Sequence, residues 1–324
     1  MICFKSLSRS PHYNLALEEW LIANWNFAKC SILYLYENSP AIVIGRHQNP
    51  WLECNIPVCR KNHVDIVRRQ SGGGTVYHDI GNVNLSFLTS KHEYKRLKNL
   101  EFIIRVLRNQ LGIKDVTISP REDLMLFDRF KISGSASRIT RIGAFHHCTL
   151  LLNVNSHKIK TYLSPKDIGI VTKATPSTRS PVGNLSQIAS GVDFERISVA
   201  MASEIDCKVP ENVDPTKENT YKGIGRIADK LKSWDWTFGK TPFFLIRGLK
   251  NKDCSLELQC RDGTIETAKI TSPVLDPHVQ ETVEDYLQGC PLREIDLKIA
   301  LQMATETIGV EINSIKQLIL SAGF

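Results

Sequence analysis

The chain has 324 residues, 42% of them hydrophobic, so it is long enough to form two domains and to bury a core in at least one. Its net charge of +7 is spread along the chain and accompanies no aromatic RNA-binding motif, so we expect acidic or phosphorylated partners and no nucleic acid. No apolar run reaches the roughly 18 residues that cross a bilayer, so we expect a soluble protein without a membrane partner.

Apolar periodicity divides the first part of the chain into short strands and helices. Ser10 and Pro11 form a helix start signal, and the apolar spacing that follows predicts a helix over 11–26. An amphipathic pattern that ends on Gly112 predicts a second long helix over 95–111. Further patterns predict strands at 2–7, 31–37, 41–46, 65–70 and 82–90, and a short helix within 55–64.

The remaining patterns suggest two domains of the α+β class. Extended segments at 123–137 and 144–154 suggest an antiparallel pair, a Thr-, Ser- and Pro-rich stretch at 172–186 predicts a loop, and a helix is expected at about 192–206. We therefore expect a large mixed-sheet domain over 1–237. Short strands around an Asp-Gly turn, followed by helical patterns, predict a small α+β C-terminal domain over 238–324.

A glycine triplet at 72–74 directly follows Arg68 and Arg69. Glycine inside a strand costs roughly 0.5–1 kcal/mol relative to alanine, so three in a row indicate that something approaches the backbone closely. Exposed N–H groups beside cationic side chains suit an anionic ligand, whereas the structural alternative is a turn that lets a strand cross under its neighbour. The motif is neither a Walker A loop nor a complete Rossmann fingerprint.

Two later stretches carry candidate chemistry. In FKISGSASR, the small residues after Lys131 leave room for an ammonium that faces a ligand, although a strand lysine usually extends to solvent. In FHHC, strand alternation puts His146 and Cys148 on one face and His147 on the other, which argues against one tetrahedral metal site. Cys148 is either a nucleophile or, more simply, a buried thiol. A serine triad also stays open, although no GxSxG elbow is present.

The nine cysteines are scattered and include no CxxC pair, which favours a reducing compartment over a disulfide framework or a zinc site.

Five segments, in order, resemble the lipoate-protein ligase and lipoyltransferase family. They are GRHQNPWLECN (45–55), RRQSGGGTVYHDIGNVNLSF (68–87), KISGSASR (131–138), FHHCTLLLN (145–153) and SWDWTFGKTPFF (233–244), and together they extend over essentially the whole chain. GRHQNPW, VYHD and HHCTLL are most similar to the mitochondrial lipoyltransferase branch of animals. The resemblance implies the biotin/lipoate protein ligase fold, with a large mixed-sheet catalytic domain that binds lipoyl-AMP and a small C-terminal accessory domain.

By motif position, the resemblance implies that Lys131 is catalytic and touches both the acyl carbonyl and the phosphate. Asp123 falls near a magnesium-contacting position of bacterial members, although the spacing to the lysine differs between branches. The implied lipoyl-adenylate contacts, besides Lys131, are Arg69, Ser71, Gly72, Gly73, Gly74, Tyr77, Asn82, Arg121, Arg138, Thr149, Thr178 and Ser180.

The implied reaction moves a lipoyl or octanoyl group from lipoyl-AMP, or from a lipoylated donor protein, to a lysine of an acceptor domain. The expected acceptors are E2 subunits of 2-oxoacid dehydrogenase complexes and the glycine cleavage H protein. Pro181 stands where bacterial ligases tend to carry a second arginine, so we expect transfer without efficient activation of free lipoate. Mg and ATP would be needed only by a full ligase, which is the alternative.

Two alternatives come from other classes: an acyltransferase that depends on Cys148, and a binding module without catalysis. We expect a monomer of the mitochondrial matrix, with the presequence absent from this chain. The alternative location is the bacterial cytoplasm.

Overall fold

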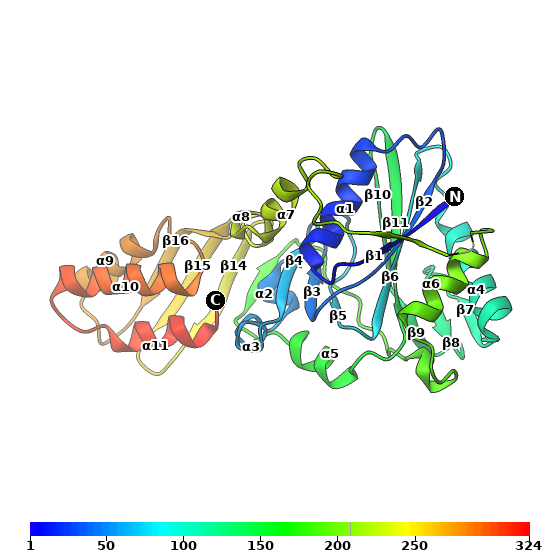
Figure 1. Ribbon diagram of the computed structural model, residues 1–324. Coiled ribbons are helices and arrows are strands. Elements are labelled where there is room, and N and C mark those ends of the chain that lie inside the picture. The colour runs from blue at the N-terminus through cyan, green and yellow to red at the C-terminus, as the bar shows by residue number, and fades with distance from the viewer. Residues whose placement is uncertain (208) are drawn as a thin grey trace. The chain divides into compact units, whose positions relative to one another are not determined.

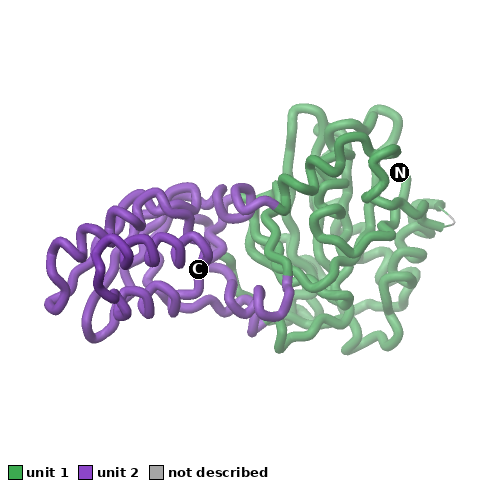
Figure 2. Tube along the Cα trace, turned by 60° about the vertical axis from the view of Figure 1, so that its left-hand side comes forward, with its two compact units in different colours: residues 1–46, 65–159, 177–232 green, residues 47–64, 160–176, 233–324 purple. Residues whose placement is uncertain are grey.

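A computed structural model describes residues 1–207 and 209–324 (Figure 1). Its contacts divide the chain into two compact units, coloured separately in Figure 2. Unit 1 consists of residues 1–46, 65–159 and 177–232, and unit 2 of residues 47–64, 160–176 and 233–324.

The second unit therefore differs from the predicted domain over 238–324, because it begins at residue 233 and also includes two earlier segments. Aromatic packing explains one of them, since the ring of Trp51 lies 5.4 Å from the rings of both Phe238 and Phe244. Strand pairing explains the other, since Ile170 lies opposite Ile246 in an antiparallel pair.

Unit 1 is built around a six-stranded mixed sheet with the order β10-β11-β6-β2-β1-β13. β1 runs parallel to β2 and β13, and the other pairs are antiparallel. The strands are β1 (Ile2–Ser6), β2 (Ile32–Glu37), β6 (Asn82–Ser90), β10 (Ser135–Ile139), β11 (Gly143–Leu151) and β13 (Glu211–Val213).

Helices cover both faces of this sheet. Leu33 and Leu35 of β2 belong to the core cluster that includes buried residues of α4 (Arg96–Leu111) and α6 (Phe194–Ser203). The alternate residues of β2 point the other way, where the Tyr34 and Tyr36 hydroxyls donate to side chains of α1 (Pro11–Asn24). The sheet thus has an α4–α6 face and an α1 face.

Local signals determine the ends of the two long helices. The Ser10 hydroxyl accepts a hydrogen bond from the Tyr13 N–H at the start of α1, and Pro11 occupies its first turn. α4 ends at Gly112, whose φ of +71° suits the left-handed position after a helix. Both predicted helices are therefore confirmed, with α1 two residues shorter than its predicted range of 11–26.

Two three-stranded sheets complete unit 1. They consist of β4 (Asp65–Arg68), β3 (Ala41–Ile44) and β5 (Val76–His78), and of β7 (Val116–Ile118), β8 (Leu124–Leu126) and β9 (Phe130–Ser133). The prediction of one extended segment over 123–137 is wrong, because it contains three short strands in two sheets. Phe127 and Asp128, both with a φ of +53°, form the turn between β8 and β9, and no glycine announces that turn. The predicted antiparallel pair survives as β10 with β11.

Unit 2 contains an antiparallel sheet with the order β12-β14-β15-β16. Its strands are β12 (Ile170–Thr172), β14 (Phe244–Lys250), β15 (Ser255–Arg261) and β16 (Thr264–Thr271). The predicted Asp-Gly turn joins β15 to β16, and both Asp262 (φ 49°) and Gly263 (φ 71°) are left-handed, as a type I′ turn requires. The unit's helices are α2 (Pro50–Glu53), α3 (Ile56–Lys61), α8 (Trp234–Thr237), α9 (Pro277–Leu287), α10 (Glu294–Ile308) and α11 (Asn313–Ala322).

The other helical segments connect these elements. They are α5 (Ser156–Tyr162), where the chain passes from unit 1 to unit 2, the 3₁₀ turn Leu185–Gln187, and α7 (Ile224–Lys232), which packs on α1.

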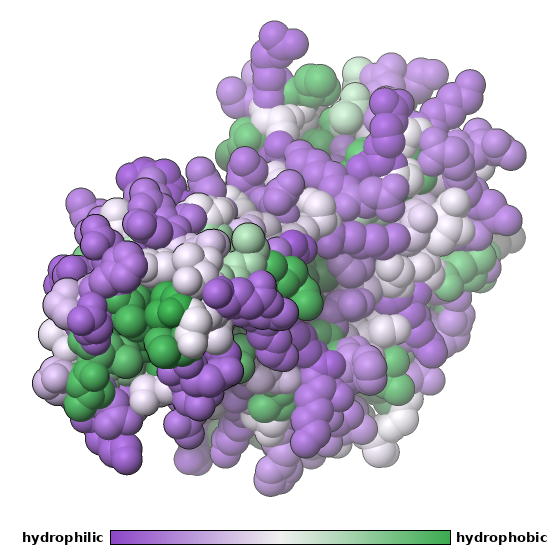
Figure 3. Space-filling model, turned by 90° about the vertical axis from the view of Figure 1, so that its left-hand side faces the viewer, coloured by the Kyte–Doolittle hydropathy of each residue, from purple (hydrophilic) through white to green (hydrophobic). Residues whose placement is uncertain are grey.

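The surface that Figure 3 shows is mostly polar, with apolar side chains gathered in places. Among the exposed apolar residues, Ile295, Ile299 and Met303 stand four positions apart on α10, and none of the predicted site residues belongs to that helix. Every helix that the structure describes is too short or too polar to cross a bilayer.

Candidate active site

The glycine loop, residues 69–75, connects β4 to β5, and both strands pair with β3. Arg69 folds back onto this loop: its Nη2 donates to the carbonyls of Gly72 (2.6 Å) and Gly74 (2.8 Å), and its Nη1 to that of Val43 (2.9 Å). Arg69 is buried, which lowers its pKa to about 10. Its guanidinium therefore holds the loop in shape, and its predicted ligand contact stays a prediction.

A side chain at each of the three glycines would meet different surroundings. Gly73 has a φ of +84°, and a Cβ there would lie 3.1 Å from Arg69 Nη2 and 3.4 Å from Ala136 Cβ. A Cβ on Gly74 would lie 3.1 Å from Ser177 Oγ. At Gly72, no described atom outside its chain neighbours lies within 4 Å of such a Cβ. The protein's own packing thus explains Gly73 and Gly74, whereas Gly72 borders open space.

A chain of buried polar side chains extends from the loop to α1. Ser71 Oγ lies 2.8 Å from His147 Nε2, and His147 Nδ1 lies 3.0 Å from Glu18 Oε2. Ser71 is only 1% exposed and its Oγ already accepts a hydrogen bond from Arg69 Nε (3.0 Å). The arrangement therefore fixes the loop instead of presenting a serine nucleophile. Sequence reasoning missed Glu18, although a glutamate on the apolar face of a predicted helix was a usable signal.

Lys131, on β9, forms an ion pair with Asp123, with Nζ and Oδ1 2.9 Å apart. Its main chain pairs with the loop that precedes the Leu185–Gln187 turn. The Lys131 N–H donates to the Pro181 carbonyl (2.8 Å), and the Gly183 N–H donates to the Lys131 carbonyl (3.0 Å). The predicted catalytic lysine is therefore held by neighbours on its main chain and at its ammonium.

Gly134 leaves space beside this ammonium. A Cβ there would lie 3.5 Å from Lys131 Cε, 3.8 Å from Lys131 Nζ and 3.8 Å from Thr149 Oγ1. Thr149 accepts the Gly134 N–H through its hydroxyl (2.9 Å), so β11 fixes the start of β10. Ser135 and Ala136, the two residues after Gly134, pack against Gly73. The glycine loop therefore lies beside the start of β10, next to Gly134.

The 177–183 loop connects these parts. Ser177 Oγ accepts the Thr75 N–H at the end of the glycine loop (2.8 Å). Thr178 Oγ1 accepts a hydrogen bond from Arg121 Nη2 (3.2 Å), in the turn that carries Asp123. Ser180 lies exposed in the same loop. The predicted residues Arg121, Thr178 and Lys131 are thus brought together, and Ser177 is a connecting residue that the sequence reasoning missed.

Three more predicted residues belong to strands of unit 1. Arg138 stands three residues beyond Ser135, roughly 10 Å along β10, and its Nη1 binds Glu19 Oε1 of α1 at 2.6 Å. Asn82 is buried at the start of β6, with its Nδ2 3.2 Å from Asn84 Oδ1, and Tyr77 is buried on β5. Their ligand contacts stay predictions.

The predicted metal role of Asp123 stays a prediction; in this structure its carboxylate faces the Lys131 ammonium. Among the residues described, no group of three or more His, Cys, Asp and Glu side chains could hold a metal ion. Mg²⁺ often takes one or two carboxylates together with substrate phosphates, so one carboxylate alone does not make a protein site.

Cys148 lies on the α4–α6 face of the sheet, next to Leu85 in the core cluster, whereas His147 points to Glu18 on the α1 face. The predicted alternation along FHHC is therefore confirmed. Burial raises the pKa of the Cys148 thiol to about 12, so it lacks the accessible thiolate that a nucleophile needs.

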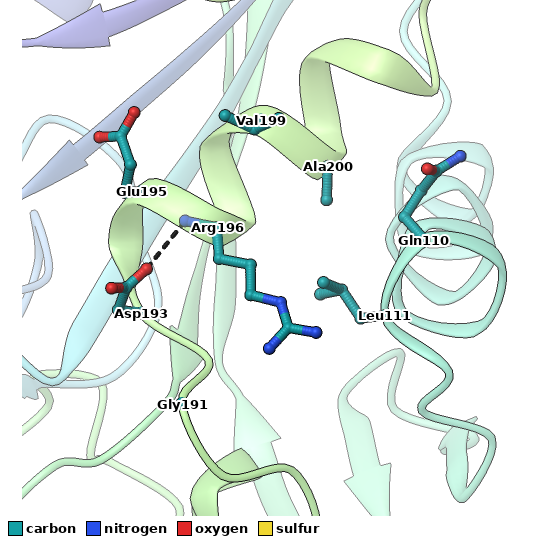
Figure 4. Close-up of a pocket in the computed structure, with 8 residues that line it drawn as sticks. All are labelled: Gln110, Leu111, Gly191, Asp193, Glu195, Arg196, Val199 and Ala200. Atoms are coloured by element: carbon teal, nitrogen blue, oxygen red, sulfur yellow. Dashed lines mark hydrogen bonds between the residues drawn. The ribbon is translucent and has the colours of Figure 1, made fainter.

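A separate groove of about 430 Å³ lies between α4 and α6 (Figure 4). The side chain of Arg196 points into it, while the Arg196 N–H donates to the helix cap Asp193 at 2.8 Å. Its lining residues belong to neither the glycine loop nor the Lys131 cluster: Gln110, Leu111, Gly191, Asp193, Glu195, Arg196, Val199 and Ala200.

Comparison with known proteins identifies the family. The profile of the lipoyl protein ligase A/B catalytic domain matches residues 10–206. The chain belongs to this family. It is 39% identical over 285 residues to the mitochondrial lipoyl amidotransferase LIPT1 of Mus musculus, covering 84% of this chain and 76% of that protein. The lipoate-protein ligase A of Psychrobacter cryohalolentis is 34% identical over 307 residues, covering 91% and 89%.

The crystal structure of P. falciparum LipL1 in complex with lipoate is similar over 99% of both chains, with a TM-score of 0.65 and 25% identity. A lipoate-protein ligase A bound with ATP has the same fold, with a TM-score of 0.58 and 20% identity over 74% of this chain and all of that one. The predicted family, its fold and the class of enzyme, a lipoyl transferase, are confirmed.

Proposed function

We propose that this protein transfers a lipoyl group from lipoyl-AMP to a lysine side chain of an acceptor domain. The observation that carries the proposal is the place of Lys131: its ammonium lies beside the side-chain-free Gly134, and the strand that follows packs against the glycine loop. Open space at Gly72 suits an anhydride that lies directly against the main chain.

The reaction needs a fixed cation near the acyl carbonyl. The neutral ε-amine of the acceptor lysine attacks this carbonyl, a tetrahedral oxyanion forms, and AMP leaves as the new amide loses a proton. Lys131 stabilises the charge on the oxyanion and on the departing phosphate. Removal of one preorganised donor of this kind typically costs 10²–10³ in rate, about 2.7–4 kcal/mol.

The chain's residues favour transfer over activation of free lipoate. Position 181 carries no cation, and its carbonyl is engaged by the Lys131 N–H. If the protein were a full ligase, Mg and ATP would supply the activation, and Asp123 would be the carboxylate that contacts the metal.

We propose E2 subunits of 2-oxoacid dehydrogenase complexes and the glycine cleavage H protein as acceptors. A related archaeal system pairs a bipartite lipoate protein ligase with its E2 lipoyl domain, at 21% identity to this chain. Since relatives with 38–39% identity are named as mitochondrial, we propose the mitochondrial matrix as the location. We also propose that the protein is a monomer.

The test is a single-turnover assay with preformed lipoyl-AMP and an isolated lipoyl domain, read by the mass of the acceptor. The wild type should add one lipoyl group, and Lys131→Ala should react at least about 10²-fold more slowly with an unchanged melting temperature. Lys98→Ala, on the exposed side of α4, is the matched control. A folded Lys131→Ala variant with normal transfer would refute the role of the lysine.

Exchange of radioactive pyrophosphate into ATP in the presence of lipoate separates the two activities. We expect little exchange together with efficient transfer from lipoyl-AMP. Robust exchange would show a full ligase.

A further inference from the structure

We infer that Asp123 is a positioning residue for lipoyl transfer: its carboxylate fixes the Lys131 ammonium beside Gly134, ready for the developing charge. The inference rests on the proposed function. It gives Asp123 a role that needs no metal ion, and it follows from three features that meet at the lysine.

The first feature is the ion pair itself. Lys131 Nζ and Asp123 Oδ1 are 2.9 Å apart, and their side chains are 24% and 15% exposed. An ion pair at a fully exposed position gains little, because water and salt screen it and two long side chains lose freedom. A short aspartate that is largely shielded from water loses less freedom, so it holds the end of a lysine more effectively.

The second feature is an irregularity in the strand pair that carries both residues. Leu124 lies opposite Ser133, but the next residue, Met125, lies opposite Lys131, so β9 has one extra residue at this point. A bulge of this kind re-aims the neighbouring side chains and is frequent beside active sites. Here it occurs next to the catalytic lysine on one strand and next to Asp123 on the other.

The third feature is the turn that presents Asp123. Glu122 is left-handed, with a φ of +59°, which is a strained conformation for a residue other than glycine. Ser119 holds the turn closed: its hydroxyl accepts the Asp123 N–H (3.1 Å), and its N–H donates to the Asp123 carbonyl (2.9 Å). Arg96 of α4 adds an ion pair to Glu122, with Nε and Oε2 2.9 Å apart. The surrounding structure thus maintains a strained turn that presents a carboxylate to the lysine.

The kinetic consequence is a split between kcat and KM. Without the carboxylate, the Lys131 side chain samples more positions, and a reacting group that is misplaced by about 1 Å can cost 10²-fold in rate. The substitution also removes the negative charge of Asp123, which would repel the phosphate of lipoyl-AMP. We therefore expect no weakening of ground-state binding, and KM should not rise.

The test compares Asp123→Asn, Asp123→Glu and Asp128→Asn in transfer from preformed lipoyl-AMP, each with Mg²⁺ and with EDTA. Asp128 is the matched control, because it is an exposed aspartate in the turn of the same strand pair. We expect Asp123→Asn to lower kcat at least tenfold under both conditions with an unchanged or lower KM for lipoyl-AMP. Asp123→Glu keeps the charge but shifts it by one methylene, so it should recover part of the rate, and Asp128→Asn should match the wild type.

Several outcomes would overturn the inference: a normal kcat in Asp123→Asn, a rise in KM alone, an Asp123→Glu variant as slow as Asp123→Asn, or a defect that appears only with Mg²⁺. The last result would assign Asp123 to a metal.

A second measurement does not depend on turnover. Acetic anhydride labelling of the ligand-free protein, followed by peptide mass spectrometry, should modify Lys131 at least threefold faster in Asp123→Asn than in the wild type, with Lys98 unchanged. Equal labelling of Lys131 would contradict the pairing. If the wild type fails to transfer lipoyl groups at all, the proposed function fails, and this labelling still decides the ion pair.

Discussion

Gly72 is the residue whose missing side chain the protein's own contacts do not explain. Because a Cβ there meets no described atom within 4 Å, we expect Gly72→Ala to keep the melting temperature of the ligand-free protein. If lipoyl-AMP lies against this residue, the added methyl should weaken its binding at least about tenfold, or 1.4 kcal/mol, in isothermal titration calorimetry.

Gly74→Ala supplies the contrast, because its Cβ would lie 3.1 Å from Ser177 Oγ in the absence of ligand. This variant should lower the melting temperature, whereas Gly72→Ala should not. Normal binding of lipoyl-AMP by Gly72→Ala would place the ligand elsewhere.

Substitution of Cys148 distinguishes direct transfer from a mechanism that uses a cysteine nucleophile. Because Cys148 is 3% exposed and burial raises the pKa of its thiol to about 12, we expect Cys148→Ser to transfer lipoyl groups at the wild-type rate. The buried hydroxyl should lower the free energy of unfolding by about 1–3 kcal/mol in urea titrations. Loss of transfer, together with an acyl adduct on the wild-type thiol by mass spectrometry, would instead support the cysteine mechanism.

At the scale of elements, the 177–183 loop joins the glycine loop to the strand of Lys131. Ser177→Ala removes the hydroxyl that accepts the Thr75 N–H, which should lower the free energy of unfolding by about 1–3 kcal/mol. The glycine loop loses a tether, so KM for lipoyl-AMP should also rise. Ser190→Ala, an exposed serine further along the chain, is the control. If KM stays unchanged in Ser177→Ala, the tether does not shape the ligand site.

The elements that the sequence predicts correctly carry their own signals. The helix 95–111 has an amphipathic period and a C-terminal glycine, and the strand 82–90 has the same bounds in the structure. The prediction of one extended segment over 123–137 is wrong because Phe127 and Asp128 form a left-handed turn inside it. No glycine in the sequence signals this turn. The pairing of Asp123 with Lys131 depends on that turn and on the bulge, so no local pattern announces it.

At the scale of the whole molecule, the change in composition near residue 238 predicts the C-terminal part of unit 2, but it does not predict the two earlier segments that belong to that unit. Residues 47–64 and 160–176 join that unit through contacts made far along the chain, such as Trp51 with Phe244. Composition within a window cannot report such contacts. The order of five family motifs, in contrast, leads to the correct family and class of enzyme.

Two buried histidines in unit 1 make stability sensitive to acid. Burial lowers the pKa of both His78 and His146 to about 3, and each neutral ring lies within hydrogen-bond distance of an asparagine amide, that of Asn38 or Asn99. The unfolded chain binds protons at both rings below about pH 6.5, while the folded chain does not. The free energy of unfolding therefore decreases as the pH is lowered from 6.5 towards 3.

Glu37 acts in the opposite direction, because burial raises its pKa to about 6. Between pH 6 and 4.5 the folded chain takes up a proton there that the unfolded chain does not, which adds at most about 2 kcal/mol of stability. The two histidines together lose up to about 5 kcal/mol between pH 6.5 and 4.5, at 1.36 kcal/mol per unit each, so their effect dominates.

We therefore expect urea titrations to give a lower free energy of unfolding at pH 4.5 than at pH 7.5. In His78→Gln/His146→Gln, neither position titrates, so the difference between the two pH values should shrink or reverse sign because Glu37 remains. This comparison is made within each variant, so any general destabilisation by the substitutions cancels. An equal difference in the wild type and in the double variant would show that groups other than these histidines set the acid sensitivity.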